Sequence, residues 1–248
     1  MYQIFQEEHK LYTENISYEE YSKKIFLPEG TCVSLVQYYD EIVEKVLKEN
    51  FELKKCQNKH IWYGEWENNR RMVVHLYQFY SHEIRFGYNY DFIPILNNQD
   101  KFVYHRTDKA VDLDVMDLYL NHIAYGNEAL NEMETFNIRR NYELPEYGTI
   151  EELDFAKTYI ENVVRNNIEF MKCFYKNISS DEDTIRFLTH TIKAGNKFDK
   201  YRYIWTKAFL YAKLQDMDKA IITMREYMEN IPENVIKKLE SVNKMFSV

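Results

Sequence analysis

The chain has 248 residues, a formal net charge of -8 at pH 7, and a hydrophobic content of 45%. This length and composition allow one large or two small domains with a substantial core, and they exclude a mainly disordered chain or a coiled coil. Because acidic proteins repel phosphate backbones, general nucleic-acid binding is disfavoured and a basic protein partner is favoured.

Three cysteines, Cys32, Cys56 and Cys173, are widely separated and form no CxxC pair. The sequence therefore offers neither a zinc knuckle nor a thioredoxin-like motif, and buried free thiols in a reducing cytoplasm are expected. The N-terminal residues have no secretory pattern, and no run of 18 apolar residues predicts a membrane span. We expect a cytoplasmic protein.

The first 53 residues predict two helices. Ser17 can cap a short helix over residues 18–26, which ends before Pro28 because the residue preceding a proline disfavours helical backbone. A longer helix is expected from about Val33 to Asn50, where apolar residues recur at spacings of three and four and form one stripe.

From residue 60 the apolar period changes to two, which indicates β-strands. A turn is expected at residues 67–70, where two asparagines follow Glu67. Together the segments predict a four-stranded antiparallel meander with strands over 61–66, 72–80, 84–90 and 101–106. We expect the first long helix to pack on the face that carries Val74, Leu76, Ile84, Phe86 and Tyr88.

Beyond residue 110 the sequence predicts helices. Two of them start with a capping box, in which Thr149 pairs with Glu152 and Ser179 with Glu182. Pro232 fits the first turn of the last helix. The expected helices span residues 112–134, 149–175, 179–195, 200–214, 217–230 and 232–246.

Small and aromatic residues recur between Ile204 and Pro232 at positions where two antiparallel helices would touch. They are Ala208, Tyr211, Ala220, Met224 and Tyr227. The segment resembles a single tetratricopeptide repeat, which implies a scaffold that presents a concave groove to a partner. Ile204, Lys207 and Tyr227 depart from the family, which typically has tryptophan, leucine and alanine there. An ordinary helical hairpin is the alternative.

The predicted fold class is α+β, with N-terminal helices, a four-stranded antiparallel β-meander and a helical C-terminal half that ends in the repeat-like hairpin. We expect a helix-plus-sheet domain over residues 1–110 and a helical domain over 111–248, with one continuous domain as the alternative. The N-terminal half is also similar to small bacterial domains of helix-plus-meander type, some of which are thought to lie near toxin genes.

The meander carries the candidate binding surface. If Val74 and Leu76 face the core, strand alternation turns the intervening side chains to the opposite face. Aromatic residues interleaved with arginine and histidine are typical of recognition surfaces. The alternative is that the C-terminal helices cover this face. The predicted partner-binding residues are Tyr63, His75, Tyr77, Arg85, Asn89 and His105.

Motifs for catalysis or metal binding are missing from the sequence. The histidines have no HExxH or HxH spacing, and the six isolated glycines cannot form a phosphate-binding loop. The acidic run Asp108, Asp112, Asp114 and Asp117 lacks the central glycine and distal glutamate of a calcium loop. We expect these acids to stabilise the start of a helix by interacting with its dipole.

These observations predict a non-enzymatic protein-binding module without cofactor or metal, whose partner is a basic protein. The most concrete form of this hypothesis is a bacterial immunity-type inhibitor of a basic toxin. One alternative is an enzyme or small-ligand binder with a pocket at the sheet, lined by His75, Arg85 and neighbouring tyrosines. A self-associating structural component is a third option.

Overall fold

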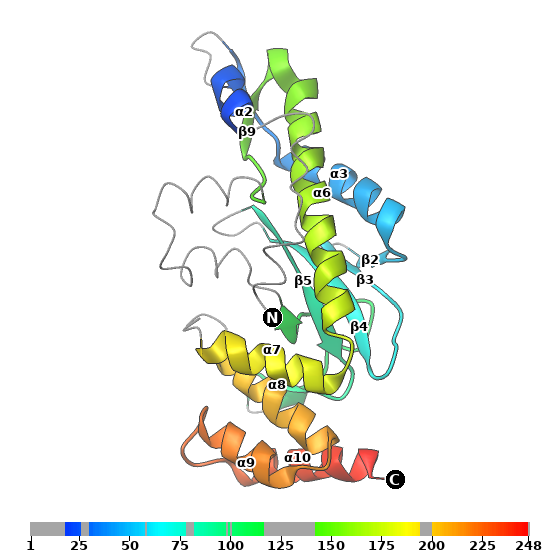
Figure 1. Cartoon of the computed structure of the whole chain (residues 1–248), viewed down its shortest axis with the longest axis vertical. Helices are drawn as coiled ribbons and strands as arrows, with labels where there is room; N and C mark the ends of the chain where they lie inside the picture. The colour runs from blue at the N-terminus through cyan, green and yellow to red at the C-terminus, as the bar shows by residue number, and fades with distance from the viewer. Residues whose placement is uncertain are drawn as a thin grey trace. The chain divides into compact units, whose positions relative to one another are not determined.

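The predicted α+β fold class is confirmed by a computed structural model, which has N-terminal helices, an antiparallel sheet and a helical C-terminal half (Figure 1). No helix in the described part of the chain has the length and apolar character needed to cross a membrane. The structure describes residues 18–25, 30–57, 59–77, 82–97, 99, 101–116, 142–193 and 200–247.

The chain divides into two compact units. Unit 1 comprises residues 1–65, 73–86 and 117–175, whereas unit 2 comprises residues 66–72, 87–116 and 176–248. Each unit therefore takes residues from both sides of position 110, where the sequence suggested a boundary.

The main sheet has five strands in the order β2-β3-β4-β5-β8. Its first four strands form a meander, and they are β2 (Lys54–Lys55), β3 (Ile61–Tyr63), β4 (Arg70–Tyr77) and β5 (Glu83–Tyr90). The turn between β3 and β4 is at the predicted place, with positive φ angles of 50° at Asn68 and 67° at Asn69. Asparagine tolerates this left-handed backbone better than most residues, which explains the asparagine pair at the turn.

The predicted fourth strand, residues 101–106, is not part of this sheet. Only Phe102–Val103 (β7) is extended, and it pairs with Ile95–Leu96 (β6) in a separate two-stranded sheet. The Asn97 side chain accepts hydrogen bonds from the backbone N–H groups of residues 99 and 101, at 2.9 and 3.0 Å, and closes a local hairpin. Closing a short loop costs little conformational entropy, so β7 pairs with β6, its neighbour in sequence.

The strand beside β5 is instead β8 (Val115–Met116), which pairs Gly87 with Met116 and Tyr88 with Val115. This strand lies at the start of the predicted helix over residues 112–134, and residues 112–114 before it are not helical, so that helix prediction is wrong for residues 112–116. The rest of the predicted helix, from residue 117 onward, lies outside the described residues.

In unit 1, the predicted helix start at Val33 is a strand. Cys32–Ser34 (β1) pairs antiparallel with Tyr147–Thr149 (β9), and the helix α3 begins only at Val36 and runs to Asn50. Thr149 is thus held in a strand, and its side chain makes no capping hydrogen bond. The predicted capping box is absent, and a 3-10 turn over Ile150–Glu152 leads into the long helix α6.

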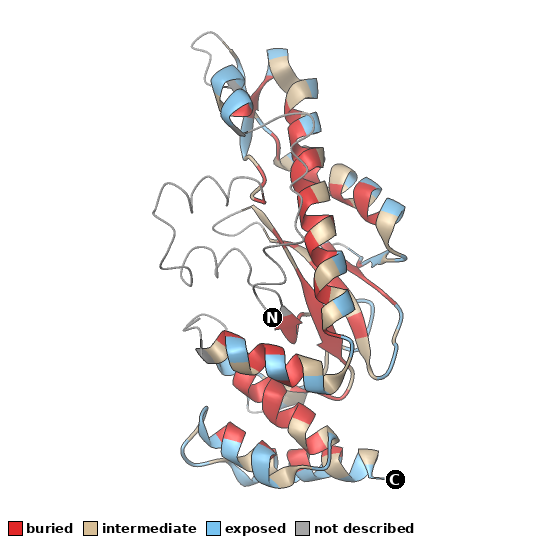
Figure 2. Ribbon diagram, viewed as in Figure 1, coloured by how far each residue is buried: buried red, intermediate tan, exposed pale blue. Residues whose placement is uncertain are grey.

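Helix α6 (Leu153–Asn177) provides much of the core of unit 1, and Figure 2 shows buried residues along most of its length. Phe86 of the sheet contacts Phe170 and Phe174, with ring centroids 5.8 and 5.5 Å apart. The partner of Phe86 is therefore α6, whereas the sequence suggested the first long helix. Ion pairs of 2.8 Å (Lys45–Glu161) and 2.9 Å (Arg165–Glu49) join α3 to α6. The short helix α2 (Tyr18–Ile25) is at its predicted place.

Unit 2 contains the helices α7 (Asp181–Lys193), α8 (Lys200–Lys213), α9 (Met217–Arg225) and α10 (Glu233–Phe246). Helix α8 packs against the other three, and residues 203–210 are all buried, as expected for a central helix.

The hairpin of α8 and α9 lies where the repeat-like pattern predicted it, with Ala208 and Ala220 fully buried. Its likeness to a tetratricopeptide repeat stays a prediction. Helix α9 ends at Arg225, earlier than expected, so that Tyr227 lies in the turn that follows.

Candidate functional site

Three of the predicted surface residues lie together in unit 1, and we call them the strand cluster: His75, Tyr77 and Arg85. The rings of His75 and Tyr77 meet edge to face with centroids 6.0 Å apart. The Arg85 guanidinium lies over the Tyr77 ring at 3.5 Å, and its Nε donates to Glu83 Oε1 at 2.6 Å. All three side chains of the cluster are partly exposed.

Tyr63 belongs to the same face of the sheet but is buried. It pairs with Val73, and Ile61 pairs with His75, so these residues share a face because opposite residues of antiparallel strands project to the same side. However, Tyr63 is only 6% exposed and Val73 is fully buried. Strand alternation predicts which side chains share a face, but it does not show how much of that face is covered.

The other two predicted residues, Asn89 and His105, belong to a polar network in unit 2. Asn89 is 1% exposed; its Oδ1 accepts from Arg71 Nε at 3.1 Å and its Nδ2 donates to Asp114 Oδ2 at 2.8 Å. His105 Nδ1 lies 3.2 Å from Asp112 Oδ2. The side chain of Asn89 therefore has an internal role in this structure.

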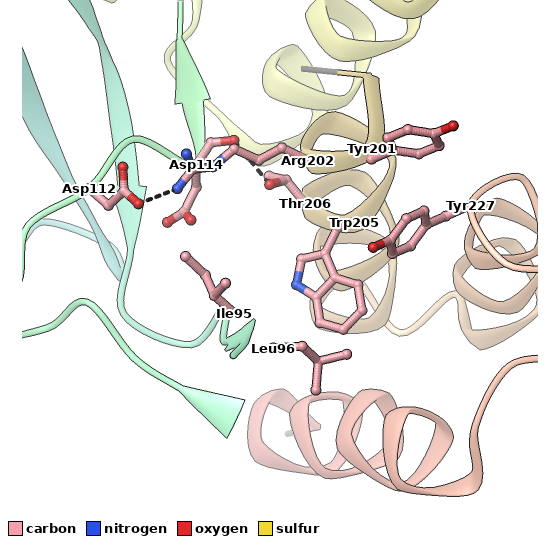
Figure 3. A pocket seen from close by; sticks show the side chains of 9 residues that line it. All are labelled: Ile95, Leu96, Asp112, Asp114, Tyr201, Arg202, Trp205, Thr206 and Tyr227. Carbon is pink, nitrogen blue, oxygen red and sulfur yellow. Dashed lines mark hydrogen bonds and ion pairs between the residues drawn. The ribbon is translucent and has the colours of Figure 1, made fainter. Parts of the chain in front are cut away.

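A pocket of about 440 Å³ lies within unit 2, between α8 and the segments that contain β6 and precede β8 (Figure 3). None of the residues that line it is among the partner-binding residues predicted from the sequence. The residues that line it are Ile95, Leu96, Asp112, Asp114, Tyr201, Arg202, Trp205, Thr206 and Tyr227.

One side of the pocket is aromatic. Tyr201 and Trp205 are four residues apart on α8 and thus share a face of the helix, and Tyr227 comes from the turn after α9. The ring centroid of Tyr227 lies 5.3 Å from that of Tyr201 and 6.1 Å from that of Trp205. Trp205 Nε1 donates to the backbone oxygen of Pro94 at 2.7 Å, which fixes the indole. The two tyrosines are 58% and 38% exposed, so this side is open to solvent.

The other side of the pocket contains two aspartates in different electrostatic environments. Asp112 Oδ2 lies 2.6 Å from Arg202 Nη2 and 3.2 Å from His105 Nδ1. Burial alone would raise the pKa of Asp112. The hydrogen bond with His105, the charge and hydrogen bond of Arg202 and the backbone N–H of Leu113 outweigh it and hold the pKa well below its ordinary value. Asp112 is therefore ionised at neutral pH.

Asp114 is more deeply buried and less well compensated. Its Oδ2 accepts from Asn89 Nδ2 at 2.8 Å and from the backbone N–H of Tyr90 at 2.7 Å, while its backbone oxygen accepts from Thr206 Oγ1 at 3.0 Å. Burial raises the pKa of Asp114 from 3.8 to about 6, against the lowering effect of Arg202 and of the hydrogen bonds from Tyr90 and Asn89. At neutral pH the pocket thus has two carboxylates and one guanidinium.

The prediction that the two aspartates mark the start of a helix is wrong, because they lie just before β8. One sequence pattern could have shown that this segment is extended. Residues 111–115 read Val-Asp-Leu-Asp-Val, and such alternation of apolar and acidic residues is typical of an extended segment with one polar face. Leu113 and Val115 are buried in the structure, in agreement with that pattern.

The fold and the pocket define an α+β protein with a cavity of a size that binds small ligands or side chains. No family model, curated protein or solved structure matches this chain. Within the described residues, no group of three or more histidine, cysteine and acidic side chains could hold a metal ion.

Proposed function

We propose that the chain is a protein-binding module whose partner is a basic protein. The observation that carries this proposal is the strand cluster. Its aromatic and arginine side chains are of the types that contribute most to interface energies. They project from adjacent strands, and the stacking of Arg85 on Tyr77 together with the hydrogen bond to Glu83 holds them in place. Preorganised side chains lose little conformational entropy on binding.

The charge of unit 1 supports a basic partner. Its residues include 14 basic and 24 acidic side chains, a net charge of -10, whereas unit 2 has 18 basic and 16 acidic side chains, a net charge of +2. The acidic character of the whole chain therefore comes from the unit that contains the strand cluster. Such a field accelerates association with a protein of opposite charge and disfavours acidic partners.

In its most concrete form, the proposal is that the protein is an immunity-type inhibitor that neutralises a basic bacterial toxin in the cytoplasm. Inhibition by occlusion needs shape and charge complementarity but no catalytic residues. The rival prediction placed a ligand pocket at His75 and Arg85. Neither residue lines the pocket of unit 2, so the strand cluster and the pocket are separate features.

The test is to recover the partner from the source cells by cross-linking to the tagged full-length chain, and then to measure the affinity with both proteins purified. We expect a stoichiometric partner with a net positive charge, and an affinity that falls as salt rises from about 50 to 500 mM. The substitution Tyr77→Ala should weaken binding at least about tenfold, because it removes the ring on which Arg85 stacks.

Tyr147→Ala is the matched control, since Tyr147 is an exposed tyrosine of the same unit outside the strand cluster. It should leave the affinity within about twofold of the wild type. Recovery of no stoichiometric partner, or of a partner whose affinity responds to neither salt nor Tyr77→Ala, would contradict the proposal.

A further inference from the structure

We propose that the pocket of unit 2 binds an organic cation that joins an ammonium group to an apolar stem, the chemistry shared by a lysine side chain and a free alkylamine. The inference is independent of the strand cluster and of the proposed protein partner. It depends on the shape, the charge and the remaining hydrogen-bonding capacity of the pocket.

The pocket separates its charged and apolar parts. Figure 3 shows the two carboxylates on one side and the three aromatic rings on the other. Leu96, Ile95 and the indole of Trp205 add apolar surface to the lining. A ligand with a charged head and an apolar stem can satisfy both parts at once, because its head can meet the carboxylates while its stem covers the apolar walls.

The sign of the charge favours a cation. Asp112 and Asp114 contribute two negative charges at neutral pH, and Arg202 contributes one positive charge. The guanidinium of Arg202 is already 2.6 Å from Asp112, so an incoming anion would compete with that carboxylate and meet the charge of Asp114 as well. An ammonium group would compensate the remaining negative charge.

Asp114 is suited to receive that group. Among the residues that the structure describes, both hydrogen bonds that its carboxylate accepts end on Oδ2, so Oδ1 can accept a bond from a ligand. By contrast, the indole N–H of Trp205 and the hydroxyl of Thr206 already donate to backbone oxygens, at 2.7 and 3.0 Å. These donors are therefore not available to recognise a carbonyl or an anion.

The aromatic side also suits a cation. Tyr201 and Tyr227 line the pocket and are partly exposed, and cations are attracted to the faces of aromatic rings. In addition, a buried carboxylate that stays charged at neutral pH lowers the stability of the fold, and such groups concentrate at functional sites. The position of Asp114 in the pocket lining is consistent with that pattern.

Binding can be measured by NMR on the full-length protein, with the Trp205 indole N–H as the reporter and Trp205→Phe to assign its resonance. The probes are n-butylammonium and Nα-acetyl-lysine methylamide. Butanol and butyrate serve as controls, because they keep a similar stem but have no charge or a negative charge. We expect both ammonium probes to shift the resonance saturably with Kd values on the order of 1 mM, and the controls to bind at least about tenfold more weakly.

Asp114→Asn tests the role of the carboxylate. The amide oxygen can still accept from Asn89 and Tyr90, so the fold should be kept while the charge is removed. We expect at least about tenfold weaker binding of both ammonium probes. Asp218→Asn is the control, because Asp218 is an exposed acid on α9 outside the pocket lining, and it should leave binding unchanged.

Butanol binding as well as butylammonium, or unaltered ammonium binding by the folded Asp114→Asn protein, would overturn the inference. If the lysine derivative binds at least as well as butylammonium, the site accepts a side chain of a protein; if only butylammonium binds, it accepts a free amine. Both results support the proposed ligand class. None of these measurements uses a protein partner, so a failure of the pocket to bind ammonium probes leaves the proposed function of the strand cluster intact. Likewise, the absence of a protein partner would not affect the proposed ligand of the pocket.

Discussion

The two units differ in what they bury. The core of unit 1 is built largely from apolar contacts, such as those of Phe86 with Phe170 and Phe174. Unit 1 also buries neutral polar groups such as Asn166 and Asn167, whereas unit 2 buries the charged side chains of Arg71 and Asp114, which Asn89 joins by hydrogen bonds. Because apolar packing is stabilising and a buried charge is costly, unit 1 is organised for stability, whereas unit 2 retains a group that reduces it.

The largest effect is expected from a cavity in the core of unit 1. Phe174→Ala removes a fully buried ring that contacts Phe86, and we expect it to lower the free energy of unfolding by about 3–5 kcal/mol. Chemical denaturation followed by circular dichroism measures this change. Ile150→Ala, at a residue that is 57% exposed, is the control and should cost less than about 0.5 kcal/mol. Equal effects of the two substitutions would contradict the assignment of the core.

The next largest effect is expected from the buried carboxylate of Asp114 in unit 2. Since the folded-state pKa of Asp114 is raised from 3.8 to about 6, the folded protein binds more protons than the unfolded chain between these values, and its stability falls as pH rises through this range. Asp114→Asn removes this dependence. As pH rises from 3.5 to 7.5, we expect the free energy of unfolding of the variant to increase by about 2–3 kcal/mol relative to that of the wild type.

Unfolding curves of both proteins at a series of pH values would measure this difference. A stability difference that is the same at pH 3.5 and pH 7.5 would show that Asp114 does not titrate abnormally in the folded state. A variant that loses stability at neutral pH would show that the ionised carboxylate is well compensated, which contradicts the contrast drawn between the units.

Local patterns in the sequence predicted part of this organisation. Strand alternation brought His75, Tyr77 and Arg85 to one face, because the direction of neighbouring side chains depends only on local backbone geometry. The asparagine pair at 68–69 predicted the turn for the same reason, since its positive φ angles are a property of those two residues.

Features that depend on distant segments were missed. Thr149 looks like a helix cap in sequence, but pairing with Cys32 holds it in a strand. Likewise, Asp112 meets Arg202 and Asp114 meets Thr206 only after α8 has packed, so the pocket has no continuous motif. A period of two also does not distinguish an open face of a sheet from a covered one, which is why the burial of Tyr63 and Asn89 was not predicted.

A smaller effect of opposite pH dependence is expected at Asp112. Its folded-state pKa is depressed, so its contribution to stability is present above pH 4 and is lost as pH falls. Because its side chain is 34% exposed, solvent screening reduces the effect, and we expect Asp112→Asn to cost about 1–2 kcal/mol at pH 7. The deficit of the variant should shrink between pH 4 and pH 2.5 in the same unfolding assay. A deficit that grows on acidification would contradict the ion pair with Arg202.

The smallest effects are expected from substitutions at the N-termini of α7 in unit 2 and α6 in unit 1. In unit 2, the capping box lies one residue later than the sequence suggested: Ser180 Oγ accepts from the backbone N–H of Asp183 at 3.0 Å, and Asp183 Oδ2 accepts from the backbone N–H of Ser180 at 3.0 Å. Ser180→Ala should therefore cost about 1 kcal/mol. In unit 1, the buried Thr149 hydroxyl has no hydrogen-bond partner among the described residues.

Thr149→Val replaces that hydroxyl by a methyl group of similar size, so it should be neutral or slightly stabilising. Both variants can be compared by thermal or chemical unfolding at pH 7. A loss of about 1 kcal/mol from Thr149→Val would mean that Thr149 does cap α6, as its spacing to Glu152 suggested. The pair of substitutions therefore decides, for two similar sequence patterns, whether local capping or pairing with a distant strand determines how the helix begins.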